Sequence, residues 1–376
     1  MFLIERLTGL FAFTGFLALT LLGVSYLKNK QYKIVLWVYV IVLAVLAYLY
    51  KPWITADLYR LHFWCSTTWC TYSWSQLFEY LYRVATPMWY LFSWTIFQVT
   101  HDVNWIQMIA CLWGFGNVLY VISDIIERNH VQGAKRALIL FSIMAVGTFY
   151  FEMLSGIRSM LGFSIVFFCM YREIIERKSA LFHIPLYIFA ALLHQATLVL
   201  VVGRITFWGL ESKNILLKML STLLIGILIP FIFIQADLYV DSAVNKAINY
   251  ATNEREYSYI WEIIIGLIEQ VQIYYILWTY KWQVGKESYQ YSLFWKLTLI
   301  IGLVSLSALP FSYAIFRRYT IFASLCTLPL LGKLFDGTPS RKIKFFVQVM
   351  WCLSLVIFVL SCARGDLCSY KFFVLN

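Results

Sequence analysis

The sequence is poor in charged residues: Asp, Glu, Lys and Arg together make up 13% of its 376 residues. Soluble domains carry about 25% charged residues, so this composition excludes an ordinary soluble globular protein. Hydrophobic residues instead make up 61% of the chain, and the mean hydropathy is +0.74. The composition therefore predicts a protein that crosses a membrane several times.

The sequence also lacks the short motifs that bind nucleotides or metals. It contains no P-loop, no Rossmann glycine pattern and no HExxH, and its eight cysteines show neither CxxC nor zinc-type spacing. Asp237 and Asp241 could share a helical face, but no clear third metal ligand accompanies them. We therefore expect neither a metal nor a cofactor. Cys65 and Cys70 share a loop, where unpaired small hydrophobic residues are the favoured interpretation over a disulfide.

Acidic residues are fewer than basic ones, 19 against 30, which gives a net charge of +11. Such an excess can indicate nucleic-acid binding, but here the basic residues recur in short loops between apolar runs. This is the positive-inside pattern of membrane proteins, so we expect no nucleic-acid partner and cytoplasmic basic loops. The predicted cytoplasmic loops are 28–33, 128–136, 172–178, 204–218, 281–286 and 333–344.

The apolar runs predict an all-α bundle of ten full crossings that forms a single transmembrane domain over residues 1–376, with both termini outside. The first run has no small-residue cleavage site after it, so it is interpreted as a retained span rather than a signal peptide. The predicted spans are 7–27, 34–50, 105–126, 137–154, 157–175, 215–234, 259–280, 292–309, 319–335 and 345–363.

Two further apolar stretches, 77–99 and 181–207, do not fit simple alternation. If 77–99 crossed the membrane, the basic loop after the next span would lie outside, against the positive-inside rule, and the same conflict arises at 181–207. We therefore expect 77–99 to be a re-entrant or interfacial segment within an outer loop 51–104, and 181–207 to be a hairpin that enters from the cytoplasm. Interrupted helices at membrane depth are tolerated only where they are buried in protein or line a cavity. Residues 235–258 form the longest polar loop, also predicted outside.

Three arginines are expected near the outer surface. A helix rises ~1.5 Å per residue, so Arg158 and Arg177 are about 28 Å apart, close to the ~30 Å thickness of a hydrocarbon core. If Arg177 lies at the inner interface, Arg158 lies at or just inside the outer one, where it must snorkel, pair or bind a ligand. Arg317 and Arg318 begin a later span. They could anchor that span at the headgroups or bind an anion through bidentate hydrogen bonds.

A histidine and two carboxylates are candidate proton-transfer groups. His194 lies near the middle of an apolar stretch, at an expected helix break. It could be a hydrogen-bonded core residue, a base or a donor to a phosphate. Asp57 and Glu79 are potential general bases, although a lone Asp is more often a loop or cap residue. The same outer segment holds the aromatic residues Tyr59, Trp64 and Trp69, which suit either sugar faces or the headgroup belt.

The order of these residues resembles bacterial oligosaccharide repeat-unit polymerases of the Wzy/EpsG type, over roughly residues 34–335. Two positions depart from the family pattern: Ser159 follows Arg158 where the family often has Gln, and Tyr80 follows Glu79 where it often has Pro. The residues that carry the resemblance are Asp57 and Tyr59, Glu79, Ser155-Gly156-Ile157-Arg158, Leu193-His194-Gln195-Ala196-Thr197 and Phe316-Arg317-Arg318-Tyr319.

The resemblance implies a GT-C-like, multispan glycosyltransferase in the cytoplasmic membrane with its active site facing outside. It would polymerise undecaprenyl-pyrophosphate-linked repeat units into a capsule, exopolysaccharide or O-antigen. The lipid-linked oligosaccharide and membrane lipids would be its partners, with a chain-length regulator and a flippase. The implied residues are Arg158, Arg317 and Arg318 for pyrophosphate, His194, Asp57 or Glu79 for proton transfer, and Tyr59, Trp64 and Trp69 for sugar.

Two alternatives share some of these features. A flippase for lipid-linked oligosaccharides would also need a cationic cavity, but it would place polar residues along both halves of the membrane and show internal repeats, which the sequence lacks. A membrane acyltransferase could use His194 as a base. It would take its acyl donor from the cytoplasm, where no matching basic and histidine signature occurs.

Overall fold

The computed structural model describes residues 2–27, 31–52, 57–84, 86–137, 156–211, 256–284, 289–310 and 313–336, with a few single positions besides. The predicted all-α architecture is confirmed for these residues, which contain no strand. The helices are α1 (Phe2–Tyr26), α2 (Gln31–Leu49), α3 (Asp57–Thr67), η1 (Trp69–Thr71), α4 (Trp74–Leu81), α5 (Pro87–Thr100), α6 (Asn104–Arg128), α9 (Ile157–Ile174), η2 (Ala180–His183), α10 (Ile184–Leu193), α11 (Gln195–Glu211), α13 (Glu256–Gln283), α14 (Tyr289–Ala308) and α15 (Tyr313–Leu334).

Every predicted span that falls within the described residues forms a helix. Four helices of this part of the chain are long and apolar enough to cross a membrane: α2, α6, residues Ile263–Gln283 of α13, and α14. The predicted spans 137–154, 215–234 and 345–363 and most of the polar loop 235–258 lie outside the described residues, so the count of ten crossings stays a prediction.

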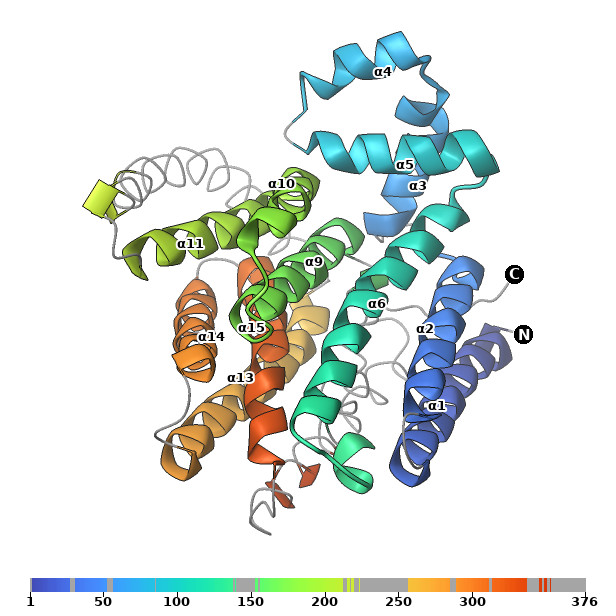
Figure 1. Ribbon diagram of the computed structural model, residues 1–376. Helices are drawn as coiled ribbons and strands as arrows, with labels where there is room; N and C mark the ends of the chain where they lie inside the picture. Colours follow the sequence, from blue (N-terminus) through green and yellow to red (C-terminus); the bar gives the residue numbers. More distant parts are fainter. Residues whose placement is uncertain are drawn as a thin grey trace.

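Helix α9 occupies the centre of the bundle, between α6 and the group formed by α10, α11 and α15 (Figure 1). Most of its side chains are buried, and they include Ser159 and Ser164. A helix that is surrounded by protein needs less hydropathy than one that faces lipid. This explains why α9 is central although it is not among the four helices that are long and apolar enough to cross a membrane.

Residues 57–100, which comprise α3, η1, α4 and α5, form a compact layer at one end of the bundle (Figure 1). We call this layer the aromatic cap. Three hydrogen bonds hold it together: the Trp69 indole N–H donates to the Ser93 hydroxyl over 2.9 Å, the Trp94 indole N–H to the Tyr72 carbonyl over 2.9 Å, and the Gln98 amide to the Cys70 carbonyl over 2.7 Å. With 14 residues, α5 is only about 21 Å long, short of the ~30 Å hydrocarbon core. This is in line with the predicted interfacial segment, whose depth stays a prediction.

A disulfide joins Cys65 to Cys70 inside the cap, with their Cα atoms 5.0 Å apart. The prediction that these cysteines are unpaired was wrong. Helix α3 ends at Thr67 and the chain turns at once into η1, which brings the two Cα atoms into disulfide range. Closing so short a loop contributes about 2 kcal/mol in the chain-entropy account.

Helices α10 and α11 form a V whose apex is His194. His183, just before α10, lies with its Nδ1 3.8 Å from Glu173 of α9, and Arg204 of α11 reaches the same carboxylate over 3.2 Å. In one straight helix, residues 183 and 204 would be about 31 Å apart. The helix break expected at His194 is therefore present, and the chain folds back there. Its entry from the cytoplasm stays a prediction.

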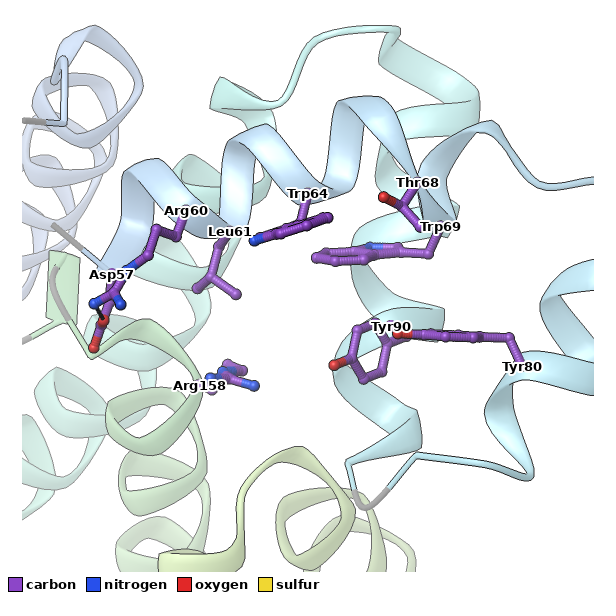
Figure 2. A pocket seen from close by; sticks show the side chains of 9 residues that line it. All are labelled: Asp57, Arg60, Leu61, Trp64, Thr68, Trp69, Tyr80, Tyr90 and Arg158. Atoms are coloured by element: carbon purple, nitrogen blue, oxygen red, sulfur yellow. Dashed lines mark hydrogen bonds and ion pairs between the residues drawn. The ribbon is translucent and has the colours of Figure 1, made fainter. Parts of the chain in front are cut away.

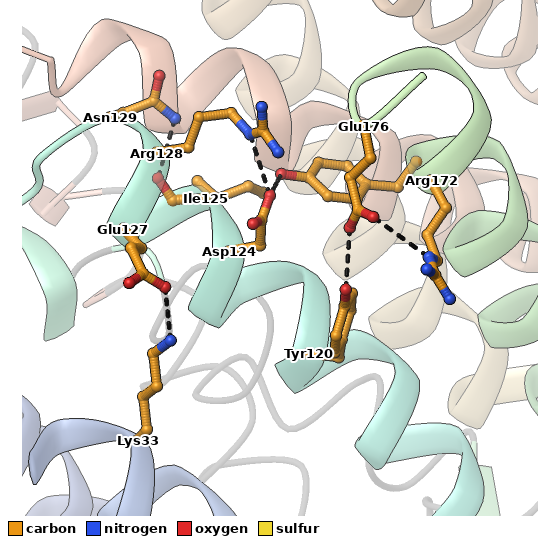
Figure 3. Close-up of polar contacts among 10 residues, drawn as sticks. Lys33, Tyr120, Asp124, Ile125, Glu127, Arg128, Asn129, Arg172 and Glu176 are labelled. Carbon is orange, nitrogen blue, oxygen red and sulfur yellow. Dashed lines mark hydrogen bonds and ion pairs between the residues drawn. The ribbon is translucent and has the colours of Figure 1, made fainter. Parts of the chain in front are cut away.

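Polar contacts join the ends of three predicted cytoplasmic loops at the end of the bundle away from the cap. Lys33 pairs with Glu127 over 2.5 Å (Figure 3), and the Tyr120 hydroxyl donates to Glu176 over 3.1 Å. The Tyr171 hydroxyl donates to Asp124 over 2.6 Å. The Arg136 guanidinium donates to the Leu27 carbonyl over 2.9 Å. The described ends of loops 28–33, 128–136 and 172–178 therefore lie near the C-terminal end of α6, one helix length from the cap.

Candidate functional site

A pocket of about 430 Å³ lies between the aromatic cap and the first turn of α9 (Figure 2). It brings together four residues that the sequence singled out: Asp57, Trp64, Trp69 and Arg158. Its lining residues are Asp57, Arg60, Leu61, Trp64, Thr68, Trp69, Tyr80, Tyr90 and Arg158.

One side of the pocket is an aromatic wall made of Trp64, Trp69, Tyr80 and Tyr90. Trp69 meets Tyr90 edge-to-face at a centroid distance of 4.8 Å, and Tyr80 meets Tyr90 in the same way at 5.2 Å. Such pairs add about 0.5–1.5 kcal/mol each beyond their buried area. The interlocked rings and the disulfide fix this wall in the absence of a ligand.

Tyr80 also supplies a hydrogen-bond donor to this wall. Burial, more than the neighbouring phenols of Tyr90 and Tyr72, raises the pKa of Tyr80 to about 12. The phenol therefore stays protonated at neutral pH and can donate to a hydroxyl oxygen.

Arg158 faces the aromatic wall from the other side of the pocket (Figure 2). It is the second residue of α9, whose N-terminal backbone N–H groups lie beside it. At the rim, Asp57 and Arg60 form an ion pair one turn apart on α3. The pocket thus combines flat apolar faces with a guanidinium group at a helix N-terminus, an arrangement that suits a ligand with both sugar and phosphate parts.

His194 and Arg318 do not line this pocket, but both are linked electrostatically to its neighbourhood. The positive charges of Arg318 and Arg158 both act on the His194 imidazole. The Nδ1 atom accepts the backbone N–H of Ala196 over 3.1 Å, so it caps the start of α11. In neutral imidazole the proton then resides on Nε2, which makes Nε2–H a donor. Arg158, His194 and Arg318 together offer donors and positive charge to an anion.

The structure places the adjacent residues Arg317 and Arg318 in different environments, which the sequence alone did not distinguish. Arg317 is buried and pairs over 2.5 Å with Glu269 of α13, which is also buried. Arg318 is half-buried on another side of α15, and no ion-pair partner for it occurs among the described residues. Helix α15 begins at Tyr313, before the predicted start of that span, so both arginines lie inside the helix rather than at its end. Arg317 anchors α15 to α13, whereas the charge of Arg318 acts on His194.

The other sequence candidates lie apart from the pocket. Glu79 is exposed on α4 and pairs with Arg83, and Tyr59 is half-buried on α3; neither lines the pocket. Glu152, a possible partner of Arg158, lies outside the described residues. Within those residues, no group of three or more His, Cys, Asp or Glu side chains could hold a metal ion.

Sequence reasoning missed two of the wall residues, Tyr80 and Tyr90. Tyr90 belongs to the stretch interpreted as interfacial, in which many aromatic residues are expected at the headgroups and none stands out. In the sequence, Tyr80 stood out only because it follows Glu79 at a position where the family often has Pro. Tyr80 lies on the inner face of α4, two residues from the exposed Phe78. No local sequence pattern indicated which face of this helix points inward.

A family model described as the EpsG family matches residues 69–372. The match covers most of the chain, including Trp69, Tyr80 and Tyr90 of the aromatic wall, as well as Arg158 and the His194 apex; Asp57 and Trp64 precede it. No curated protein and no solved structure matches the chain.

Proposed function

The chain belongs to the EpsG family, a family of polysaccharide-polymerase type, and from this premise we propose the reaction that it catalyses. It joins oligosaccharide repeat units that are carried on a polyprenyl pyrophosphate such as undecaprenyl pyrophosphate. The product is a surface polysaccharide, made at the outer face of the cytoplasmic membrane. A flippase that delivers the units and a chain-length regulator are the expected partners.

The observation that carries this proposal is the opposition of Arg158 to an aromatic wall across one pocket. Flat rings pack against the C–H faces of sugars, while a guanidinium group grips phosphate oxygens in a bidentate manner. The sugar part of a lipid-linked unit would lie along Trp64, Trp69 and Tyr90, with its pyrophosphate at Arg158. The proposed binding mode thus occupies both the aromatic wall and the Arg158 side of the pocket.

In the proposed step, an acceptor hydroxyl oxygen attacks the anomeric carbon of the donor. A new glycosidic C–O bond forms, and the bond between the anomeric carbon and the pyrophosphate oxygen breaks. The lipid pyrophosphate leaves with an additional negative charge, which Arg158 and Arg318 stabilise together with the Nε2–H of His194. Fixed donors of this kind need no reorganisation as charge develops.

The acceptor proton needs a base, and Asp57 is the carboxylate that lines the pocket. His194 is less suited to this role in the observed geometry because its Nδ1 already accepts a hydrogen bond. Glu79 points away from the pocket. We therefore assign proton removal to Asp57 and phosphate binding to His194.

Two features support an outward-facing site. Disulfides persist in oxidising compartments, and the Cys65–Cys70 bond lies in the aromatic cap, each cysteine next in sequence to a tryptophan of the pocket wall. The basic loops gather at the opposite end of the bundle, as expected for the cytoplasmic side. The two arguments rest on different chemistry and agree on the orientation.

A reconstituted assay tests the proposal. Purified protein in vesicles, given lipid-linked repeat units from its native pathway, should yield a polymer ladder without added metal or nucleotide sugar. Arg158→Ala should lower the rate by about 100-fold or more, since one fixed donor at a developing anion is worth that much. Arg128→Ala, at the opposite end of the bundle, serves as the control and should polymerise normally.

Failure of the folded wild-type protein to polymerise native units would refute the proposed reaction. An Arg158→Ala protein with wild-type rate and chain length would remove Arg158 from it.

A further inference from the structure

The outer face of α4 carries a row of exposed aromatic side chains. Trp74, Phe78 and Tyr82 are spaced four residues apart and are 57%, 50% and 80% exposed. Their rings are in contact along the row, at centroid distances of 6.4 and 5.3 Å, and Trp94 of α5 extends it at 5.2 Å from Trp74. We call these four residues the α4 ridge. From Trp74 to Tyr82 it is about 12 Å long.

The α4 ridge and the pocket lie on opposite faces of the same short helix. Leu77 is fully buried and Tyr80 lines the pocket, so these residues mark the inner face of α4. Phe78 and Tyr82, each two residues from Tyr80, point the other way. In Figure 1, α4 is the part of the cap farthest from the membrane-spanning helices. The ridge therefore faces away from the bundle.

The charges around the ridge do not suit an anionic membrane. The charged side chains of residues 57–100, His62 aside, are Asp57, Arg60, Glu79 and Arg83, and they form two internal ion pairs. The cap is thus electroneutral and contains no lysine. Surface helices that bind anionic lipids are rich in Lys and Arg on their polar face. A neutral partner with both apolar faces and hydrogen-bonding groups fits better.

A row of polar groups runs beside the aromatic row. Glu79 and Arg83 each follow a ridge residue in sequence, and their paired side chains are 68% and 72% exposed. The carboxylate can accept hydrogen bonds and the guanidinium can donate them, while the rings offer flat apolar faces. These are the complementary groups for the hydroxyls and the C–H faces of sugar rings.

We propose that the α4 ridge binds a saccharide chain outside the pocket, as a resting surface for the polymer under construction. The identity of that chain as the enzyme's own product rests on the proposed polymerase function. A chain held by the ridge stays near the pocket between additions, which raises its effective concentration at the site. The ridge then governs how long the product grows, whereas the pocket governs whether a linkage forms.

The direct test is saccharide binding to the full-length protein in detergent. The ligand is an oligosaccharide of two or three repeat units, cut from the surface polysaccharide of cells that carry this gene. Trp74→Leu and Phe78→Leu keep apolar side chains but remove the flat rings. Each should weaken binding about tenfold, as expected when an exposed aromatic anchor worth ~1.4 kcal/mol is lost. Trp282→Leu, an aromatic residue of α13 that is 75% exposed, is the matched control and should bind as the wild type does.

The second readout is polymer length in the reconstituted assay. The ridge variants should make shorter chains while the initial rate of linkage formation stays unchanged. Binding that is equal in the wild type, the ridge variants and the control overturns the proposal, as does a wild-type protein that binds no saccharide.

A headgroup anchor predicts a different pattern. Leu partitions into membranes about as well as Phe, so the Leu variants would then retain function while Phe78→Ser loses membrane insertion; that result also overturns the proposal. A wild-type protein that binds saccharide at the ridge but forms no polymer would refute the polymerase function and leave the ridge site standing.

Discussion

At the scale of single residues, two neighbours in sequence have different environments. Successive helix positions point about 100° apart because a turn takes 3.6 residues. Arg317 therefore turns to Glu269 of α13, while Arg318 is near enough to His194 for its charge to act there. The Thr320 hydroxyl accepts from the Gln270 amide over 2.8 Å, which fixes the rotation of α15 about its axis. Arg317 thus holds the helix, and Arg318 is the arginine to which we assign a part in the proposed reaction.

Replacing each of the two arginines should separate these roles. Arg318→Ala should reduce polymerisation by about 100-fold while the protein unfolds at its usual temperature. Arg317→Ala leaves Glu269 buried without its partner, which costs about 3–5 kcal/mol and should lower the unfolding temperature. A double variant, Arg317→Met with Glu269→Leu, should recover that stability. Equal thermal stability of the two single variants would contradict this division.

The protonation of His62, on α3, is expected to make the local stability of that helix depend on pH. The Nε2 atom of His62 is buried and has no hydrogen-bond partner within the part of the chain that the structure describes. Burial lowers the pKa of His62 to about 4, and the negative charge of Asp102 opposes this shift but is the weaker influence. An unfolded histidine has a pKa of about 6.5. Between these two values the unfolded segment binds a proton that the folded one does not.

The local stability of α3 should therefore fall as the pH drops from about 6.5 towards 4, and should not depend on His62 above that range. Hydrogen exchange of the α3 amides, corrected for the intrinsic rate at each pH, measures this. His62→Gln, which cannot titrate, should keep the same protection at pH 7 and pH 5. A parallel loss of protection in the wild type and in His62→Gln would show that other groups are responsible.

At the scale of elements, the position of His194 depends on a close approach of α11 to α9. A Cβ atom on Gly162 would lie 2.5 Å from the Thr197 hydroxyl and 3.2 Å from its Cβ atom. Thr197 is fully buried, three residues beyond His194. The Tyr319 hydroxyl donates to the Ala196 carbonyl over 3.1 Å and ties α15 to the same apex. The apex is held between α9 and α15, so its placement requires glycine at position 162.

Gly162→Ala should push the apex away from α9 and displace His194 from Arg158. We expect a loss of about 1–3 kcal/mol in stability, as for other overpacked cores, together with reduced polymerisation. Adding Thr197→Gly removes the clashing side chain and should restore much of the activity. Activity and unfolding temperature of the single and double variants test this coupling. Wild-type behaviour of Gly162→Ala would mean that the apex does not depend on this contact.

At the scale of the whole molecule, the protein has two chemically distinct ends. One end holds the aromatic cap, the Cys65–Cys70 disulfide and the pocket. The other holds the basic loops, joined by ion pairs such as Lys33 with Glu127. Helix α6 runs from one end to the other, a length of about 37 Å, enough to cross the hydrocarbon core. This polarity gives the molecule an orientation that can be tested in cells.

Cysteine labelling in intact cells should report that orientation. Ser75→Cys in the cap should react with a membrane-impermeant maleimide, whereas Gln132→Cys in the basic loop 128–136 should react only after the cells are permeabilised. Both positions are exposed, so accessibility of the side chain does not limit either one. Labelling of Gln132→Cys from outside would overturn the predicted topology and the non-crossing interpretation of 77–99.

Local patterns predicted much of the fold and part of the site. Hydropathy located the long described helices but not α3, and charge predicted that the loops 28–33, 128–136 and 172–178 share one side, because both properties act on contiguous stretches of chain. The pairing of Cys65 with Cys70 was missed because it depends on how abruptly α3 ends. The different environments of Arg317 and Arg318 were missed because they depend on which helices pack against α15.

The sequence by itself determined that this is a helical membrane protein of the EpsG family, with candidate residues in an order typical of repeat-unit polymerases. Composition, hydropathy and short motifs suffice for this assignment because each depends only on which residues the chain contains and on their order along it. Only the tertiary structure decided that Asp57, Trp64, Trp69 and Arg158 share one pocket while Glu79 and Arg317 do not line it. The direction in which a side chain points is set by helix phase and by packing partners that can lie far away in the sequence.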